Sequence, residues 1–111
     1  MQIRPQGIRN YITPTGRDPY RQWHAQIKDG RTRAIITTRI ERLQHGNPGD
    51  FRRLNKDLYE LRIDYGPGYR VYFGRFHDFI ILLGGGTKRT QQRDITRSQN
   101  YWNDFLERIK E

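Results

Sequence analysis

Two short runs of alternating apolar and polar residues, joined by a glycine- and proline-rich turn, constrain this chain more than any other feature. In residues 58–64, Tyr59, Leu61 and Ile63 alternate with charged residues, and residues 69–73 repeat the pattern. Residues 65–68, Tyr-Gly-Pro-Gly, supply turn chemistry between the runs. A one-residue slip would turn every side chain to the wrong face. The pattern therefore predicts a β-hairpin in which Arg62 lies opposite Arg70.

This predicted arginine pair has two explanations. Like charges directly across an antiparallel pair are mildly destabilising, so an anion could bind between them. Alternatively, Glu60 and Asp64 neutralise them, and the hairpin alone leaves both explanations open. The next segment favours the anion. Residues 79–83, Phe-Ile-Ile-Leu-Leu, are apolar without alternation, which is typical of a strand covered on both faces. They run directly into Gly-Gly-Gly-Thr-Lys-Arg at 84–89, which predicts a basic, glycine-hinged loop leaving a rigid sheet.

These motifs resemble the RelE/HigB group of bacterial toxins, in the RelE/ParE superfamily branch called addiction module killer proteins. Its members typically read L-x-E-L-R-I, G-P-G-Y-R-x-Y-F and G-G-x-K-x-x-Q-x-x-D-I. This chain has ELRI at 60–63, GPGYRVYF at 66–73 and GGTKRTQQRDI at 85–95. With a weaker N-terminal pattern, the resemblance covers nearly the whole chain. One departure is Thr87, where the family often carries an acidic residue, and it makes the segment more basic.

The resemblance implies a toxin of a toxin–antitoxin module that inhibits translation as a ribosome-dependent mRNA endoribonuclease without a metal or other cofactor. Its expected partners are the ribosome, mRNA and a cognate antitoxin, which is expected to carry a helix-turn-helix DNA-binding domain. Arg70 matches the family's transition-state arginine, and Lys88 and Arg89 fall in the basic segment that holds the phosphate. These three are the expected catalytic residues. The expected RNA-binding residues are Arg62, Tyr72, Gln91 and Arg93, and no residue is assigned as general base.

The residues themselves favour this chemistry over other kinds. RNA cleavage needs little from a protein because the 2′-hydroxyl is an internal nucleophile, so positioned cations supply most of the catalysis. His24, His45 and His77 lack paired metal-ligand spacing, and the glycine run lacks the spacing of a nucleotide-binding P-loop. Two alternatives stay open. One is a ParE-like toxin that acts on DNA gyrase without cutting RNA, and the other is a basic nucleic-acid-binding module without catalysis.

The charge and length of the chain are consistent with these candidate functions. The 111 residues fit a single domain, 1–111, and carry 21 basic against 12 acidic residues, a net charge of +9. The surplus belongs to the first 93 residues, since residues 94–111 hold more acidic than basic groups. Such a balance favours nucleic acid, an acidic protein or an anionic membrane surface as partner. Because no signal peptide, membrane span or cysteine is evident, we expect a cytoplasmic protein that does not bind a membrane.

Local patterns complete the predicted fold. Residues 8–13 are a candidate strand, and Asp18 followed by Pro19 predicts a helix of about ten residues. Residues 31–45 are predicted to form a second helix antiparallel to the first, with a solvated face that bears Arg31, Arg39 and Arg42. Asp94 is the expected N-cap of an amphipathic C-terminal helix.

The predicted class is α+β and RelE-like. We expect a twisted antiparallel sheet of about four strands, with two N-terminal helices on one face and the C-terminal helix closing the core. The opposite face is expected to stay open. Arg62, Arg70, Tyr72 and residues 88–93 would line the rim of that face, where a polyanion could lie.

Overall fold

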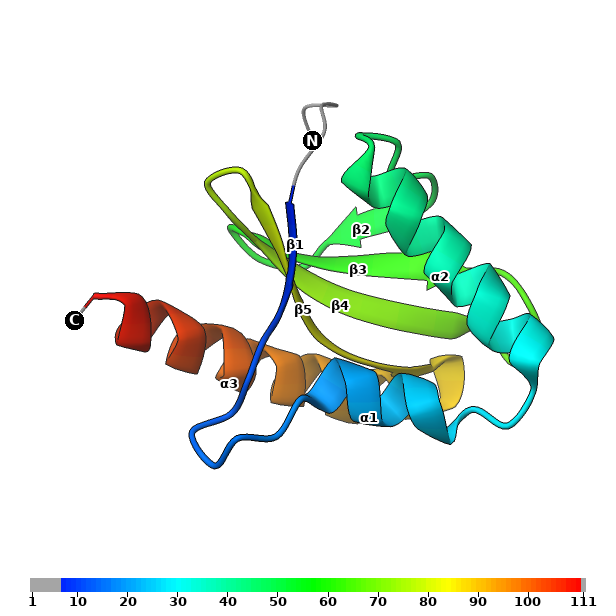
Figure 1. Ribbon diagram of the computed structural model, residues 1–111, viewed down its shortest axis with the longest axis horizontal. Helices are drawn as coiled ribbons and strands as arrows, with labels where there is room; N and C mark the ends of the chain where they lie inside the picture. The colour runs from blue at the N-terminus through cyan, green and yellow to red at the C-terminus, as the bar shows by residue number, and fades with distance from the viewer. Residues whose placement is uncertain (1–6, 111) are drawn as a thin grey trace.

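The computed structural model describes residues 7–110 and contains one five-stranded sheet and three α-helices (Figure 1). In chain order the elements are β1 (Gly7–Asn10), α1 (Pro19–Gln26), α2 (Gly30–Gln44), β2 (Phe51–Arg53), β3 (Leu58–Ile63), β4 (Tyr69–Phe76), β5 (Phe79–Thr87), the 3₁₀ turn η1 (Lys88–Thr90) and α3 (Gln91–Ile109). The α+β class is confirmed.

The sheet differs from the prediction in strand number and direction. Its order is β1-β5-β4-β3-β2, and β1 runs parallel to β5 while the other neighbours are antiparallel. The expected four-stranded antiparallel sheet is therefore wrong. β2 has only three residues, too few to show the alternation that identifies a strand. The direction of β1 is set by its partner across the sheet, which no local pattern reports.

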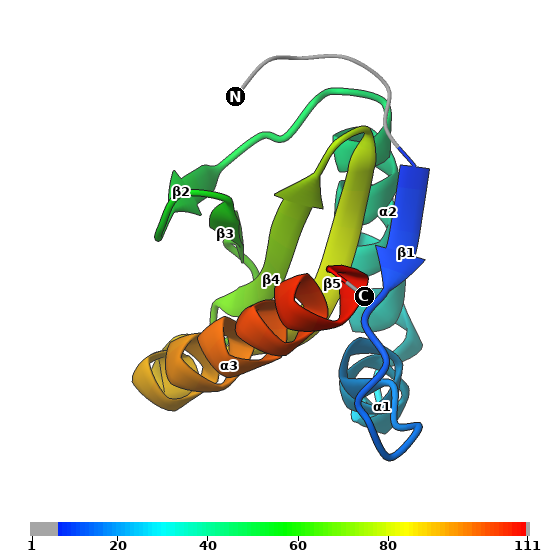
Figure 2. The same ribbon diagram turned by 90° about the vertical axis from the view of Figure 1, so that its left-hand side faces the viewer.

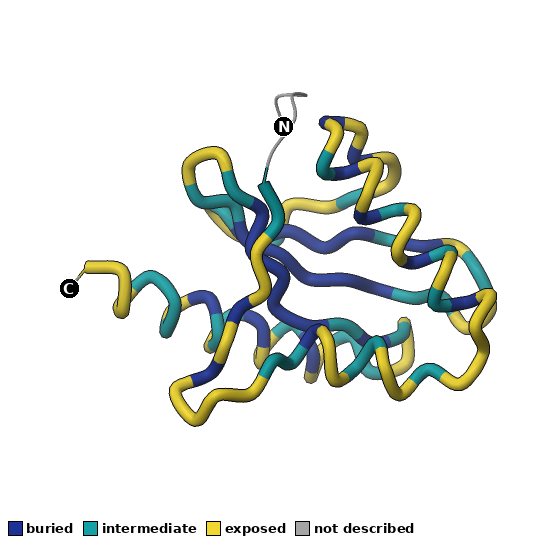
Figure 3. The backbone as a smooth tube through the Cα atoms, viewed as in Figure 1, coloured by how far each residue is buried: buried dark blue, intermediate teal, exposed yellow. Residues whose placement is uncertain are grey.

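The predicted hairpin register is confirmed. β3 and β4 pair Tyr59 with Phe73, Leu61 with Val71 and Arg62 with Arg70, as their apolar alternation requires. A register shift after Tyr72 in the β4–β5 pair gives β5 one extra residue. The three central strands are buried along most of their length (Figure 3). β4 is thus paired with β3 along one edge and with β5 along the other.

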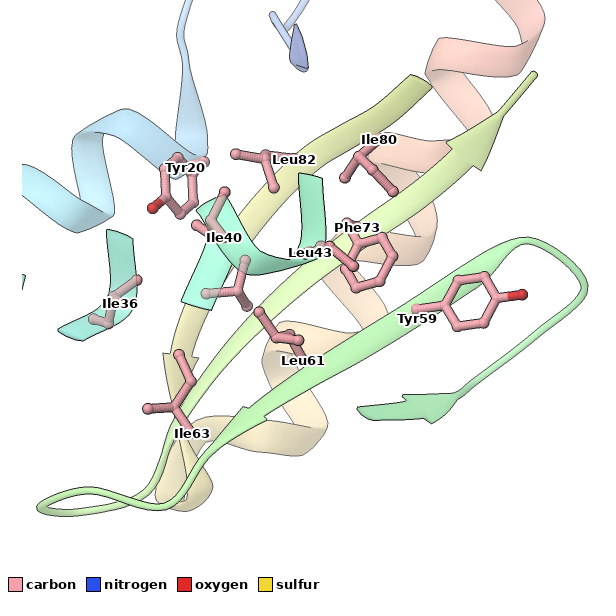
Figure 4. Packing of buried hydrophobic residues seen from close by; sticks show 11 residues of the cluster. Tyr20, Ile36, Ile40, Leu43, Tyr59, Leu61, Ile63, Phe73, Ile80 and Leu82 are labelled. Carbon is pink, nitrogen blue, oxygen red and sulfur yellow. The ribbon is translucent and has the colours of Figure 1, made fainter. Parts of the chain in front are cut away.

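Helices cover both faces of the sheet. On one face, α1 and α2 pack on the alternate residues of the central strands (Figure 4). This cluster contains Tyr20, Ile36, Ile40, Leu43, Tyr59, Leu61, Ile63, Val71, Phe73, Ile80 and Leu82. The other face is covered by α3 (Figure 2), whose Trp102 packs with Tyr11, Leu58, Tyr72, Ile81 and Leu83. The expectation of an open second face is therefore wrong, because the apolar stripe of α3 is buried there.

The helix starts follow capping chemistry. Asp18 accepts a hydrogen bond from the Arg21 amide at 3.0 Å, and Pro19 opens α1 as predicted. Asp29 caps α2 in the same way. The two helices diverge from their connection instead of lying antiparallel (Figure 1). α3 starts at Gln91, so the prediction of Asp94 as its N-cap is wrong, and Asp94 lies within the first turn.

Arg39 does not belong to a solvated helix face as expected. Its guanidinium donates hydrogen bonds to the carbonyl oxygens of Arg62 at 2.7 Å, Pro48 at 3.0 Å and Asp50 at 3.1 Å. These contacts join α2 to the segment that leads into β2 and to the end of β3. Arg31 and Arg42 are exposed, as predicted.

Candidate nucleic-acid interface

A buried carboxylate, Glu60, lies at the centre of the polar residues on the α3 side of the sheet. Its side chain is 0% exposed. Arg52 Nε and Arg62 Nε lie 3.4 and 3.8 Å from Glu60 Oε1, and Gln91 Nε2 donates a hydrogen bond to Oε2 at 2.8 Å. Removing a carboxylate from water is costly unless it is paired. These contacts therefore connect β2, β3 and the first turn of α3 through one side chain.

Arg70 and Tyr72 lie beneath the start of α3. Arg70 is only 6% exposed and Tyr72 is fully buried, so the prediction that they face an open surface is wrong. Arg70 Nη1 donates to the Tyr69 carbonyl at 3.1 Å, while its Nε has no hydrogen-bond partner among residues 7–110. Burial, with the nearby charges of Glu60 and Asp94, raises the pKa of Tyr72 well above its usual range. Tyr72 therefore stays neutral and is not available for stacking on a base in this conformation.

Lys88 and Arg89 are exposed on η1, directly after β5. The Lys88 amide donates to the Gly68 carbonyl at 2.8 Å, which ties η1 to the turn of the β3–β4 hairpin. Gly68 has a φ of 82°, and a Cβ there would lie 3.4 Å from Arg70 Nη1 and 3.5 Å from Lys88 Cβ. Arg70 and Lys88 thus flank the same turn residue, one buried and one exposed.

The predicted glycine-hinged loop is instead strand, turn and helix. Gly84, Gly85 and Gly86 belong to β5, and residues 88–93 form η1 and the first residues of α3. A Cβ on Gly85 would lie 2.3 Å from the Trp23 ring, and one on Gly86 would lie 1.9 Å from Asp94 Oδ2. Two of these glycines are therefore needed for close packing. A loop hinge was a wrong interpretation of the same residues.

The structure divides the predicted site residues into three groups. Arg62, Arg70, Tyr72 and Gln91 gather around Glu60, and Lys88 and Arg89 lie at the adjoining surface. Arg93 lies apart, because residues two positions apart on an α-helix point to nearly opposite sides and Arg93 follows Gln91 by two. Its Nε is 3.7 Å from Asp94 Oδ1. The list of candidate site residues missed Glu60 and Arg52. The alternation of β3 puts Glu60 on the same face as Arg62, and this could have identified Glu60 from the sequence. Arg52 lies on β2, which is too short to show such a pattern.

A groove of about 420 Å³ lies on the Arg93 side, between α1, the end of β5 and α3. Trp23 and Tyr101 contribute aromatic surface to its lining, and Gly85 contributes backbone. Arg17, Arg93 and Arg97 are exposed where they line it. The described residues therefore include this groove and, apart from it, the Glu60 cluster, which is the set of Arg52, Arg62, Arg70, Tyr72 and Gln91 around Glu60, with exposed Lys88 and Arg89 beside it.

This arrangement suits phosphate or carboxylate recognition by arginine and lysine. Among residues 7–110, no group of three or more histidine, cysteine or acidic side chains is placed to hold a metal ion. Within the same part of the chain, no helix combines the length and apolarity needed to cross a membrane.

The fold and these surfaces define a small basic α+β protein, and comparison with known proteins adds one relative. The chain is 46% identical over 78 residues to an uncharacterized protein of Haemophilus influenzae. The matched region covers 69% of this chain and 79% of the relative. This chain belongs to the same family as that Haemophilus protein. No protein-family model matches the chain, and no solved structure matches it.

Proposed function

We propose that this protein is a RelE/HigB-type toxin that cuts mRNA on the ribosome without a metal or cofactor. The observation that carries the proposal is the position of Arg62, Arg70 and Lys88 around one hairpin turn. Arg62 and Arg70 are direct cross-strand partners, and Lys88 is bonded through its amide to Gly68 in the adjoining turn. Three cations converging on a small area can stabilise a pentacoordinate phosphate as its negative charge develops.

Each cation has a proposed role that follows its exposure. Lys88 and Arg89 contact the substrate phosphates first, because both are exposed on η1. Arg70 lies beneath them and stabilises the transition state, with Nε as unused hydrogen-bonding capacity. Arg62, which is about 40% exposed, and Gln91 bind the RNA strand from the β3 side. Glu60 is fully buried and acts as a positioning residue that holds Arg52, Arg62 and Gln91.

The burial of Tyr72 supports ribosome dependence. Proteins that hold single-stranded RNA alone use exposed aromatic side chains on which bases stack. With Tyr72 buried, the Glu60 cluster offers charge but no such platform. The ribosome would supply the substrate alignment, which also places the activity in the cytoplasm. An antitoxin with an acidic surface and a helix-turn-helix domain would neutralise the toxin by covering the cationic residues.

One observation favours the alternatives, a gyrase-directed ParE-like toxin or a non-catalytic binding module. Glu60 already compensates Arg52 and Arg62, so part of the cationic charge has a structural partner. The same compensation would hold in a protein that only binds nucleic acid or another anionic partner. Catalysis and binding therefore need a functional test.

Induced expression in a bacterium, with mapping of transcript 5′ ends, tests the proposal. We expect growth arrest and new 5′ ends in translated mRNA. Lys88→Ala should remove both while leaving thermal stability near that of the parent, because Lys88 is exposed. Arg42→Ala, an exposed arginine on α2, is the matched control and should retain toxicity.

Purified protein then separates the alternatives. We expect cleavage of a defined mRNA on programmed ribosomes and little cleavage of the same RNA alone. Equal cleavage of naked RNA would contradict ribosome dependence. Growth arrest with no new 5′ ends and no cleavage in either reaction would favour the gyrase-directed or binding-only function.

A further inference from the structure

The far end of β5 has a free edge. β1 covers β5 only as far as Leu82, where the Tyr11 amide donates to the Leu82 carbonyl at 2.9 Å. The chain then turns away toward α1. From Gly84 to Thr87, β5 has β4 on one side and none of the described strands on the other. This stretch forms part of the lining of the groove between α1 and α3.

A hydrogen bond of η1 shows which way the backbone amides at the end of β5 point. The Lys88 amide donates to the Gly68 carbonyl on the β4 side. Because amide directions alternate along a strand, the amide of Gly86 also points toward β4. Gly85 and Thr87 therefore face the groove. The Thr87 amide is satisfied locally, because it donates to Thr90 Oγ1 at 3.3 Å. Gly85 is left with an amide and a carbonyl that point into the groove.

An unpaired edge of this kind accepts an added strand. Gly85 is half-exposed, with the Trp23 ring packed against its backbone on the α1 side. The absence of a side chain leaves its amide and carbonyl accessible from the groove. An extended peptide backbone offers the complementary carbonyl and amide in one residue, whereas a nucleic-acid strand has no backbone amide to donate. The geometry thus favours a peptide over RNA.

The charge of the groove selects the kind of peptide. Arg17, Arg93 and Arg97 are exposed along it; Arg17 precedes α1, and Arg93 and Arg97 lie one turn apart on α3. The carboxylate in the lining, Asp94, is buried and accepts a hydrogen bond from Thr90 Oγ1 at 2.5 Å. Because side chains of an extended peptide alternate between the two walls, acidic residues at every second position share one wall and can reach Arg93 and Arg97 on α3.

We propose that this groove binds a short, extended, acidic segment of a protein partner, which pairs with Gly85 as an added strand. The site is separate from the Glu60 cluster and does not depend on the nuclease assignment. Its recognition has two parts, backbone pairing at Gly85 and charge pairing with arginines of the groove. Each part can be removed without the other.

The test uses isotope-labelled protein and a short, capped peptide of alternating glutamate and valine. We expect the peptide to shift the Gly85 amide resonance and slow its hydrogen exchange. N-methylation of the central peptide residue removes its backbone donor and should weaken binding roughly tenfold, the size of one lost hydrogen bond. The same peptide with lysine in place of glutamate should not bind. Arg97→Glu should weaken binding by at least about tenfold at low salt, and Arg42→Glu on α2 should not change it.

Three results would overturn the proposal. If the glutamate–valine peptide does not slow hydrogen exchange of the Gly85 amide, the edge is not a strand acceptor. If the N-methylated or lysine peptide binds as tightly as the parent peptide, recognition is not by backbone pairing or by charge. If a single-stranded oligouridylate perturbs Gly85 at lower concentration than the acidic peptide, the groove belongs to nucleic acid.

Discussion

The Gln91 side-chain amide donates a hydrogen bond to the buried carboxylate of Glu60 at 2.8 Å, joining the first turn of α3 to the middle of β3. This contact connects residues 31 positions apart in the sequence. It also holds the start of α3 over the face that contains Arg70 and Tyr72. The accessibility of Arg70, the proposed catalytic arginine, therefore depends on how stably the first turn of α3 is held against β3.

Glu60→Gln should destabilise the fold by about 1–3 kcal/mol, because Arg52 and Arg62 lose their carboxylate partner while the buried amide presents a donor to them. Chemical denaturation measures this. Asp64→Asn removes the same charge from an exposed position after β3 and should change stability by less than about 0.5 kcal/mol. Equal effects from the two variants would mean that net charge, not the Glu60 contacts, determines stability.

Gly86→Ala should be strongly destabilising, by about 3 kcal/mol or more, since its Cβ would lie 1.9 Å from Asp94 Oδ2 and 2.8 Å from Asp94 Cγ. Either α3 or Asp94 must move. Gly30→Ala is the matched control, because a Cβ at the start of α2 approaches only the end of the Arg33 side chain, at 3.4 Å. The control should be neutral or stabilising by up to about 1 kcal/mol. A mild Gly86→Ala would show that the packing there is loose.

Arg39→Met should cost about 2–3 kcal/mol, because three carbonyl oxygens lose a charged donor while the apolar part of the side chain is kept. Arg42→Met, on the exposed face of α2, should have little effect. Urea denaturation of both variants tests the difference. A near-parental midpoint for Arg39→Met would remove Arg39 from the contacts that hold the start of β2.

Stability should fall at alkaline pH through Tyr11. Burial, with the hydrogen bond to Asp104 at 2.6 Å, raises the pKa of Tyr11 from 10.0 to about 12. A raised folded-state pKa contributes stability that is fully present below the unfolded-state pKa and is lost as the pH rises through the folded-state pKa. The unfolding free energy should therefore decline between about pH 10 and about pH 12.

Tyr11→Phe should make that alkaline decline shallower and lower the stability at neutral pH through loss of the Asp104 hydrogen bond. Tyr65→Phe, a half-buried tyrosine in the hairpin turn, is the control. Unfolding curves across the alkaline range measure both slopes. An unchanged slope in Tyr11→Phe would assign the alkaline loss to other groups, with buried Tyr20 and Tyr72 the next to test.

The sequence by itself determined the local features of this protein. Alternation in residues 58–64 and 69–73 fixed the hairpin and its register, because only one pairing keeps the apolar side chains on one face. Asp18 with Pro19 marked the start of α1, and the spacing of Ile36, Ile40 and Leu43 identified α2 as a helix. Each of these signals acts within a few residues. The cross-strand position of Arg62 and Arg70 follows from them directly.

Only the tertiary structure decided which faces are covered and what each glycine is for. The apolar stripe of α3 predicted burial but not the face on which it packs, and that choice buried Arg70 and Tyr72. Gly86 resembled a hinge because no nearby residue in the sequence shows why glycine is needed there. The residue that requires it is Asp94 of α3, which lies eight positions later and is a neighbour only in the folded structure. Local periodicity reports how a segment divides into polar and apolar sides. Packing between segments depends on shape and charge that only the assembled chain brings together.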